Sequence, residues 1–564
     1  MKNIKNNLKI KLLIVISIFS AALFSCSDYL DVDNDTDNPK IAPLNFLLTD
    51  IAIKLARITN FNVNSGSILA VYAHSATSRE EEDQYGVKVD NINMRNDWDD
   101  IYLTLNNIES LIKTGNESGS LVYVGLGQIQ KAYIMSVAVD LWGDVPYTEA
   151  SKLPQGILSP KFDDQKLIYK EIFNLLETGK NNAKSLTGKK PAADDLFYAG
   201  NTSKWVKFAN TLKLKLYNQT RLASDFDAVG FNNLITENNF FSSSSDDFQF
   251  EHTAAIAPSN ERNKLYIESY ESTQFGSYQS PWFYEVLKGV NPNIHNGNPD
   301  PRMPYYFYNQ LKAGVLPADT AIGTNPNADY WDKSTGFFSI RFGSVGPNRD
   351  RSAENSYTYP GIFPCGGKYD DGLGGVVAGE SGAKGVAPKR ILTYAEMLFI
   401  QAELINSGKL TGNAGIVFEQ AVRAAFTKVD EVVTKSKTTQ VVPVLVGSTR
   451  VINFVTNLMT EFNAANTTKQ LEIIMTQKWV ATFGDPMDQY TDYRRTGFPI
   501  LANPIGISPE YQLNNADGFP LDDSQTKLDG QYQVSLFWPQ SELNANQNAP
   551  DQKNPTTYKI FWDN

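Results

Sequence analysis

The chain has 564 residues, of which 20% are charged, and its formal net charge at pH 7 is −11. This length is sufficient to bury a large hydrophobic core. The acidic balance excludes a polyanion such as nucleic acid as the expected ligand, because phosphate backbones bind basic surfaces.

The first 25 residues have the features of a secretory signal peptide. Lysines precede an apolar run from Leu12 to Phe24, which is too short to span a bilayer as a mature helix. Small residues then lead directly into Cys26, and this approach resembles the bacterial lipobox, in which the cysteine is lipidated and becomes the first mature residue. We therefore expect a signal peptide over residues 1–25 and a lipid anchor with a polar tether over residues 26–42.

The tether contains Asp31, Asp33 and Asp35, which have the alternating spacing of an EF-hand calcium loop. Thr36 occupies the position of the turn glycine, and Ala42 that of the bidentate glutamate. The sequence therefore favours a simple tether, without a metal.

Residues 43–235 have helical apolar spacing, as in Trp98, Tyr102 and Leu105. Gly, Asn and Pro clusters interrupt this spacing, for example at residues 143–146. Successive helices are therefore expected to pack as antiparallel pairs, in a short helical solenoid with degenerate repeats.

The composition changes between about residues 237 and 390, where Ser, Asn, Gly and Pro are frequent and the aromatic residues follow no helical period. We expect a loop-rich region that folds over the helices and forms most of a ligand surface. Helical spacing returns over about residues 391–500, so the fold class is mainly α, with one domain over residues 43–564.

Several longer motifs are distributed along nearly the whole chain. They include AYIMSVAVDLWGDVPYTEA at 132–150, DLFYAGNTSKWVKFANTLKLKLYNQT at 195–220, ILTYAEMLFIQAELINSG at 391–408 and QKWVATFGDPMDQYTDYRRTGFPIL at 477–501. Together, and in this order, they resemble the SusD/RagB family of nutrient-binding outer-membrane lipoproteins, in particular its second large subgroup. Two positions depart from the family pattern: Lys215 stands where relatives often have Arg, and Phe498 stands where Tyr is common.

The resemblance implies a tetratricopeptide-like helical scaffold that carries an irregular ligand-binding region. It also implies a lipoprotein of the outer membrane, exposed at the cell surface, that sits as a lid on a TonB-dependent transporter of the SusC type. The expected function is therefore to capture an oligosaccharide, or an oligopeptide, and to deliver it to that transporter.

Aromatic side chains are the natural binding platform for a sugar, because the apolar face of the sugar ring stacks on them. Trp282 and Trp331 lie in the loop-rich region, and their neighbours Tyr278, Tyr284 and Tyr330 complete our set of candidate ligand-binding rings. The alternative is that these rings form a satellite core under long loops. The tryptophans on helical segments are expected to be core residues, namely Trp98, Trp142, Trp205 and Trp479.

Four further side chains are candidates for contacts with a ligand. Arg79 and Tyr85 lie in an acidic segment, HSATSREEEDQY, that joins two early helices; a solvated charge run is the alternative interpretation. Arg494 and Arg495, in the RRTG stretch, could clamp a carboxylate or sulfate, but pairing with Asp488, Asp492 or a helix C-terminus would fix a buried turn instead, and we favour that structural interpretation.

The sequence predicts no catalytic residue, cofactor or metal site. His74, His252 and His295 are far apart, and neither His-Glu-x-x-His nor Gly-x-Ser-x-Gly is present. A carboxylate pair that hydrolyses glycans leaves no recognisable motif, so a surface glycan hydrolase stays as a rival interpretation. A non-transport adhesive protein is the third.

Overall fold

The computed structural model describes residues 42–61, 63–272, 276–317, 329–345, 355–377, 382–502 and 526–563. Cys26 and the three aspartates of the tether lie outside the described residues. Helices dominate this part of the chain, which confirms the mainly α prediction.

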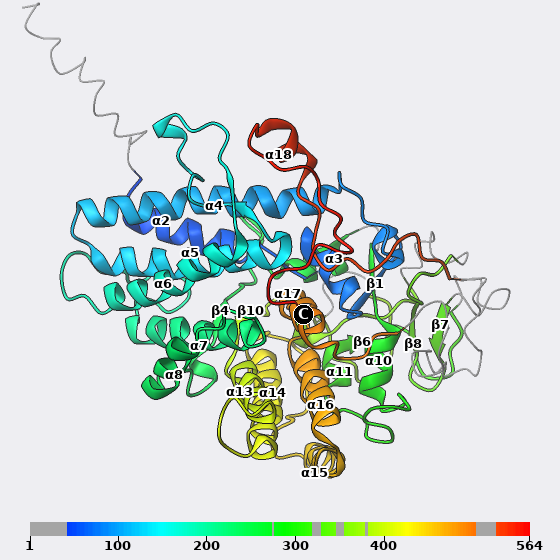
Figure 1. Ribbon diagram of the computed structural model, residues 1–564. Helices are drawn as coiled ribbons and strands as arrows, with labels where there is room; N and C mark the ends of the chain where they lie inside the picture. The colour runs from blue at the N-terminus through cyan, green and yellow to red at the C-terminus, as the bar shows by residue number, and fades with distance from the viewer. Residues whose placement is uncertain are drawn as a thin grey trace, which may run out of the picture.

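The N-terminal half of the scaffold is a stack of helices, coloured blue to green in Figure 1. They are α2 (Leu44–Leu55), α3 (Ser65–Tyr72), α4 (Ile92–Glu117), α5 (Leu121–Trp142), α6 (Gln165–Ala183), α7 (Thr202–Thr220) and α8 (Ala228–Glu237). Helix α5 packs between α4 and α6 and is buried along almost its whole length. Polar caps begin these helices: the side chains of Asn91, Asp164 and Asn201 each accept a hydrogen bond from the first turn of α4, α6 and α7.

The middle of the chain is built from short elements. Its helical turns are η3 (Ser244–Asp246), α9 (Lys264–Tyr266), the π-helical turn η4 (Ile267–Glu271), α10 (Pro281–Lys288), α11 (Met303–Tyr306) and α12 (Ile362–Cys365). Its strands are β4 (Phe248–Phe250), β5 (Ser277–Gln279), β6 (Phe307–Tyr308), β7 (Asp329–Asp332), β8 (Phe337–Ile340), β9 (Tyr359–Pro360) and β10 (Lys389–Leu392). Each strand pairs antiparallel with one other: β4 with β10, β6 with β9, β7 with β8, and β5 with β1 (Ala76–Ser78).

A second set of helices completes the scaffold and is coloured yellow to orange in Figure 1. It consists of α13 (Tyr394–Asn406), α14 (Ala414–Lys435), α15 (Thr449–Ala464), α16 (Thr467–Ala481) and α17 (Pro486–Thr496), and α18 (Gln540–Ala545) follows near the C-terminus. Helix α13 contacts α7, so the two halves of the scaffold are joined directly. No helix in the described ranges has the length and apolar character needed to cross a bilayer.

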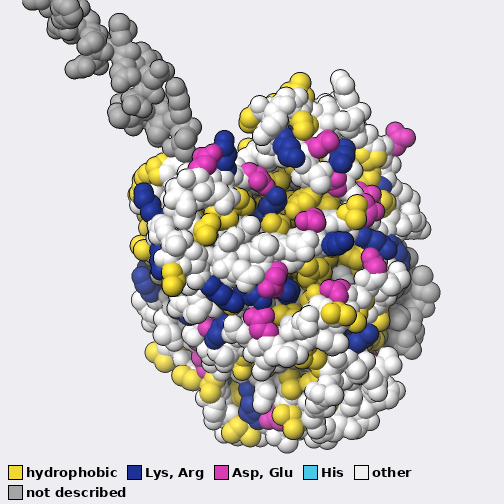
Figure 2. Space-filling model, turned by 60° about the vertical axis from the view of Figure 1, so that its left-hand side comes forward, with side chains coloured by type: hydrophobic (Ala, Val, Ile, Leu, Met, Phe, Trp, Pro, Cys, Tyr) yellow, Lys and Arg dark blue, Asp and Glu magenta, His cyan; other side chains and the backbone are white. Residues whose placement is uncertain are grey.

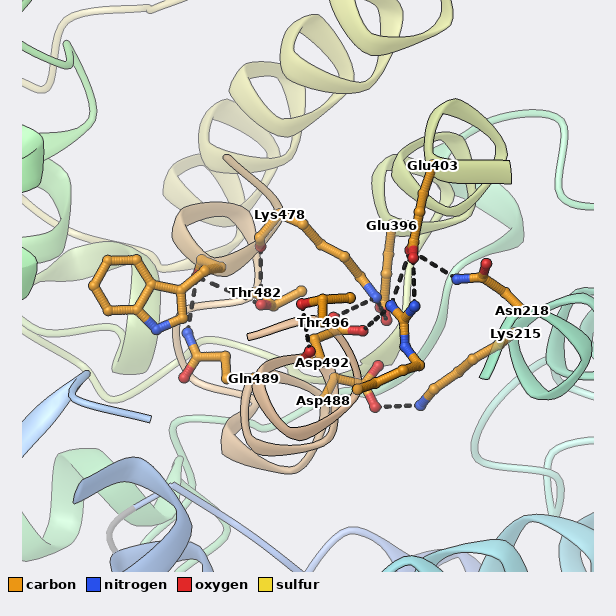
Figure 3. Close-up of polar contacts among 12 residues, drawn as sticks. Lys215, Asn218, Glu396, Glu403, Lys478, Thr482, Asp488, Gln489, Asp492 and Thr496 are labelled. Carbon is orange, nitrogen blue, oxygen red and sulfur yellow. Dashed lines mark hydrogen bonds and ion pairs between the residues drawn. The ribbon is translucent and has the colours of Figure 1, made fainter. Parts of the chain in front are cut away.

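A buried ionic network fastens this junction (Figure 3). Arg495 on α17 donates hydrogen bonds to Glu403 on α13 and to Asp492 on its own helix, over 2.9 and 2.8 Å. Lys478 on α16 pairs with Asp492 over 2.7 Å, and Lys215 on α7 pairs with Asp488. The structural interpretation of Arg495 is therefore confirmed, and Lys215 is a member of the same network.

One hydrophobic cluster runs through the helices of both halves and through the middle region. The four helical tryptophans belong to it, with exposed fractions of 3% or less, as the sequence predicts: Trp98, Trp142, Trp205 and Trp479. A smaller, separate cluster lies under β7 and β8 and is rich in tyrosine, including Tyr278, Tyr308 and Tyr357.

Candidate functional site

A pocket of about 250 Å³ opens where the N-terminal helices meet the middle region. We call it the Ser78 pocket. Nine of the eleven residues that line it are polar, namely Asn64, Ser67, Ser78, Glu80, Glu82, Asn93, Glu268, Ser269 and Ser277.

Elements far apart in the sequence bring these residues together. The ladder between β1 and β5 places Ser78 directly opposite Ser277. Asn64 precedes α3, Asn93 lies in the first turn of α4, and the turn η4 supplies Glu268. The pocket therefore exists only when the loop-rich region has folded onto the scaffold.

The backbone around the pocket is strained. Thr59, Asn64, His74 and Tyr85 adopt φ angles of 51°, 50°, 51° and 54°. Such left-handed conformations cost a non-glycine residue on the order of 1–3 kcal/mol, and they are concentrated at functional sites. Short π-helical turns such as η4 are also frequent at functional sites. Both features mark this junction as a candidate site.

Asp97 holds the backbone that enters α3 in this conformation. Its carboxylate accepts hydrogen bonds from the amides of Thr59 and Ser65, each over 3.2 Å, and from the side chain of Asn64 over 3.4 Å. Asp97 is buried, so these donors replace its hydration. The asparagine at the edge of the pocket is thereby fixed in place.

The pocket carries negative charge. Glu82 is 6% exposed, accepts a hydrogen bond from the Ser78 hydroxyl over 3.3 Å, and has a pKa that burial raises above its ordinary value. Glu80 and Glu268 add two carboxylates, and the described residues that line the pocket include no lysine or arginine. Carboxylates, amides and hydroxyls are the groups that recognise ligand hydroxyls, whereas an anionic ligand would be repelled.

Among the described residues, no group of three or more His, Cys, Asp and Glu side chains is arranged to hold a metal ion.

Four of the rings expected to form a platform are buried. Trp282 is 4% exposed, and its indole nitrogen donates to the carbonyl of Ile500 over 3.0 Å. Tyr278, Tyr284 and Tyr330 are 1% exposed or less. The prediction that these four rings are exposed is therefore wrong.

The physical reason is that aromatic residues of the middle region pack against one another. The ring of Tyr284 stacks on Phe337 with centroids 3.9 Å apart, and its hydroxyl donates to Asp332 over 2.6 Å. The hydroxyl of Tyr330 donates to Glu285 over 3.0 Å. Trp282, Tyr284 and Tyr330 belong to the main hydrophobic cluster and Tyr278 belongs to the smaller one, so the alternative interpretation of a satellite core holds for Tyr278 alone.

The other three candidates are half-buried and lie outside the lining of the Ser78 pocket. Trp331 on β7 packs against the smaller tyrosine-rich cluster. Arg79 forms an ion pair with Glu80 over 3.5 Å, and the Tyr85 hydroxyl is hydrogen-bonded to His74 Nε2 over 3.0 Å. Their contact with a ligand stays a prediction.

Tyr284 also lines a second depression, of about 360 Å³, which we call the Tyr369 cleft. Asp370 in this cleft accepts a hydrogen bond from Asn309 over 2.8 Å, and burial raises the pKa of Asp370 to about 6. Arg450 also lines the cleft, which therefore combines three aromatic residues, Tyr284, Phe307 and Tyr369, with charges of both signs.

Sequence reasoning identified the segment that supplies Glu80 and Glu82 but missed Asn64, Asn93 and Glu268. A single polar residue in a helical first turn or in a loop has no periodic signal. Only the cap Asn91, two residues before Asn93, indicated that a helix begins there.

Comparisons with known proteins agree with this architecture. The model of a SusD-like family, described as starch-binding and associating with the outer membrane, matches residues 34–517. No curated protein shows significant sequence similarity to the chain.

Solved structures share the fold at low sequence identity. A SusD homologue from Bacteroides fragilis is 18% identical and matches with a TM-score of 0.62, over 93% of this chain and 99% of its own. A SusD/RagB family protein from Bacteroides thetaiotaomicron is 19% identical, with a TM-score of 0.63 over 93% of this chain and 99% of its own. A chitin-binding protein is 20% identical, with a TM-score of 0.65 over 92% of this chain and 100% of its own.

Proposed function

Because the chain belongs to the SusD-like family of starch-binding proteins that associate with the outer membrane, we propose that it captures a neutral oligosaccharide in the Ser78 pocket and releases it unchanged. The observation that carries the proposal is the lining of this pocket, in which carboxylates, amides and hydroxyls converge without a cationic side chain. Such a lining matches the hydroxyl groups of a sugar.

Anchoring and delivery belong to the same proposal. The lipobox-like approach to Cys26 supports a lipid anchor at the outer membrane, facing the outside of the cell. The SusD/RagB resemblance supports delivery of the ligand to a TonB-dependent transporter of the SusC type. An enzyme is not required, because capture and transfer leave the bonds of the ligand intact.

An array of glycans and peptides probed with the full chain tests the proposal. We expect neutral oligosaccharides to bind, acidic glycans to bind weakly, and the bound glycan to be recovered uncleaved. Binding of peptides alone would identify an oligopeptide carrier, and cleaved products would favour the rival glycan hydrolase.

Calorimetry with the best oligosaccharide then locates the site. Asn93→Ala removes an amide from the pocket and should weaken binding about fivefold, since one hydrogen bond is worth roughly 1 kcal/mol. The matched control is Asn106→Ala, an exposed asparagine farther along the same helix. If Tyr369→Ala abolishes binding and Asn93→Ala leaves it intact, the site is the Tyr369 cleft.

A further inference from the structure

A pocket of about 430 Å³ lies on the helical scaffold and shares no lining residue with the Ser78 pocket or the Tyr369 cleft. Helices α6 and α7, the turn before α8 and the C-terminal segment enclose it, and we call it the scaffold pocket. Figure 2 views this helical side of the molecule, where apolar side chains line hollows between basic and acidic ones.

Partly exposed rings, together with Leu167 and Ala223, form the apolar part of the scaffold pocket. Phe173, Phe226 and Phe561 line it, and each is half-buried. Phe173 stacks on Tyr217 with centroids 4.4 Å apart, and Phe226 meets the same tyrosine edge-on at 6.0 Å. The phenyl rings are thus held in place while part of their surface faces the pocket.

Polar side chains surround these rings. Lys166 and Asp225 form an ion pair over 3.7 Å, and their side chains are 45% and 51% exposed. Lys170 and Asn174 extend from α6, and Asp227 accepts a hydrogen bond from the Tyr217 hydroxyl over 3.3 Å. Donors and acceptors therefore stand beside an aromatic floor.

We propose that the scaffold pocket is a second ligand site of this protein and that it binds a neutral pyranose ring of a glycan. Its volume lies in the range of small-molecule sites, roughly 300–1,000 Å³. The aliphatic face of a pyranose stacks on phenyl rings, while its hydroxyls bond to carboxylate, ammonium and amide groups. An apolar side chain of a partner protein would contact the rings but would form no hydrogen bonds with the polar groups that line the pocket. The inference goes beyond the proposed function and does not depend on the Ser78 pocket.

Saturation-transfer NMR on the full chain tests this site directly, with methyl α-D-glucopyranoside, N-acetyl-D-glucosamine and N-acetyl-L-phenylalanine amide as probes. The experiment is run in the Asn93→Ala background, which weakens binding at the Ser78 pocket. Phe226→Ala should then reduce saturation transfer to at least one pyranose at least threefold. The matched control is Phe46→Ala, whose ring on α2 is 66% exposed and lines none of the three pockets.

Asp225→Ala provides a second test in case Phe226→Ala fails to fold. Asp225 is exposed, so its replacement leaves the packing of the aromatic rings intact. It should also reduce the transfer at least threefold, with an unchanged circular dichroism spectrum.

The proposal is overturned if neither pyranose receives saturation, or if the transfer is equal in Phe226→Ala, Asp225→Ala and Phe46→Ala. Binding of the phenylalanine amide alone would overturn it in favour of a partner protein's side chain. If Phe226→Ala reduces the saturation transfer but Asn93→Ala does not weaken binding of the oligosaccharide selected on the array, the scaffold pocket is retained as a ligand site and the Ser78 pocket is rejected.

Discussion

Glu403 lies between two buried arginines. Its carboxylate is fully buried and accepts hydrogen bonds from Arg495 over 2.9 Å and from Asn218 over 2.8 Å, and it pairs with Arg221 over 2.8 Å. Burial alone would raise the pKa of Glu403, but the charges of the two arginines outweigh burial and lower the pKa to about 2. The ionised form is therefore the one that holds α7, α13 and α17 together.

The first prediction concerns the pH dependence of stability. The unfolded chain protonates Glu403 near 4.5 and the folded chain near 2, so this group stabilises the fold above pH 4.5 and loses that contribution as the pH falls toward 2. Between pH 4.5 and 3, the free energy of unfolding should fall faster in the wild type than in Glu403→Gln, by about 1 kcal/mol per pH unit. At pH 7 the variant should be less stable by about 3–5 kcal/mol, because it removes the carboxylate that lies between two buried arginines and leaves Arg495 with Asp492 as its carboxylate partner. Urea denaturation at several pH values measures both effects, and parallel pH curves would contradict the role given to Glu403.

Individual side chains show where sequence reasoning succeeds. Arg495 could be assigned to structure because an acidic partner stands three residues away, at Asp492. Trp282 could not be placed in the same way, because its indole nitrogen is hydrogen-bonded to Ile500, more than two hundred residues later in the sequence. A local signal did exist: Ser280 caps α10 and Pro281 occupies its first position, which places Trp282 in a helix rather than in an exposed loop.

Two helices approach each other unusually closely at Gly125 on α5 and Gly179 on α6. A Cβ atom on Gly125 would lie 2.5 Å from the backbone nitrogen of Ala183 and 2.6 Å from the carbonyl oxygen of Gly179. Only backbone atoms oppose it there, so no side-chain rearrangement can relieve the clash.

The second prediction follows from this crossing. Gly125→Ala should destabilise the protein by about 1–3 kcal/mol, although alanine favours a helix, because the two helices must separate. Gly127→Ala on the same helix is the matched control: its new Cβ meets the side chains of Ile112 and Leu111 at 3.0 and 3.3 Å, and these can shift. Urea midpoints compare the two variants. Equal stability of both would show that the glycine crossing is not needed.

Long helices were predictable as elements, whereas the short strands were not. Helices such as α4 and α7 carry their own apolar periodicity. The ladder between β1 and β5 joins segments about two hundred residues apart, with three residues on each side. Strands this short carry no usable alternation, and the Ser78 pocket depends on their pairing, so its full composition could not be derived from the sequence.

The whole molecule is organised around one core that both halves of the scaffold share. Residues from α2 to α17 belong to the same hydrophobic cluster, and rings of the middle region such as Trp282 and Phe283 insert into it. The middle region is therefore not an independent module that packs on a finished scaffold.

The third prediction is that the chain unfolds in one cooperative transition. Far-ultraviolet circular dichroism, which follows the helices, and tryptophan fluorescence, which includes Trp282, should give the same urea midpoint. A fluorescence transition that precedes the loss of helix would mean that the middle region unfolds on its own.

The fourth prediction concerns the proposed anchor. Cys26→Ser should abolish incorporation of radiolabelled palmitate and move the protein from the membrane fraction to the soluble fraction, because the acyl chains are expected on that thiol. The matched control is Cys365→Ser, since the second cysteine is buried in the fold. Retention of the label in Cys26→Ser would reject the lipobox interpretation.

Capture of an intact glycan at the junction of scaffold and loops is tested most directly by a crystal structure of the full chain with the oligosaccharide selected on the array. We predict uncleaved sugar density in the Ser78 pocket, with hydroxyls bonded to Asn93 and Glu82. Density confined to other surfaces, or a hydrolysed product in the pocket, would contradict the account.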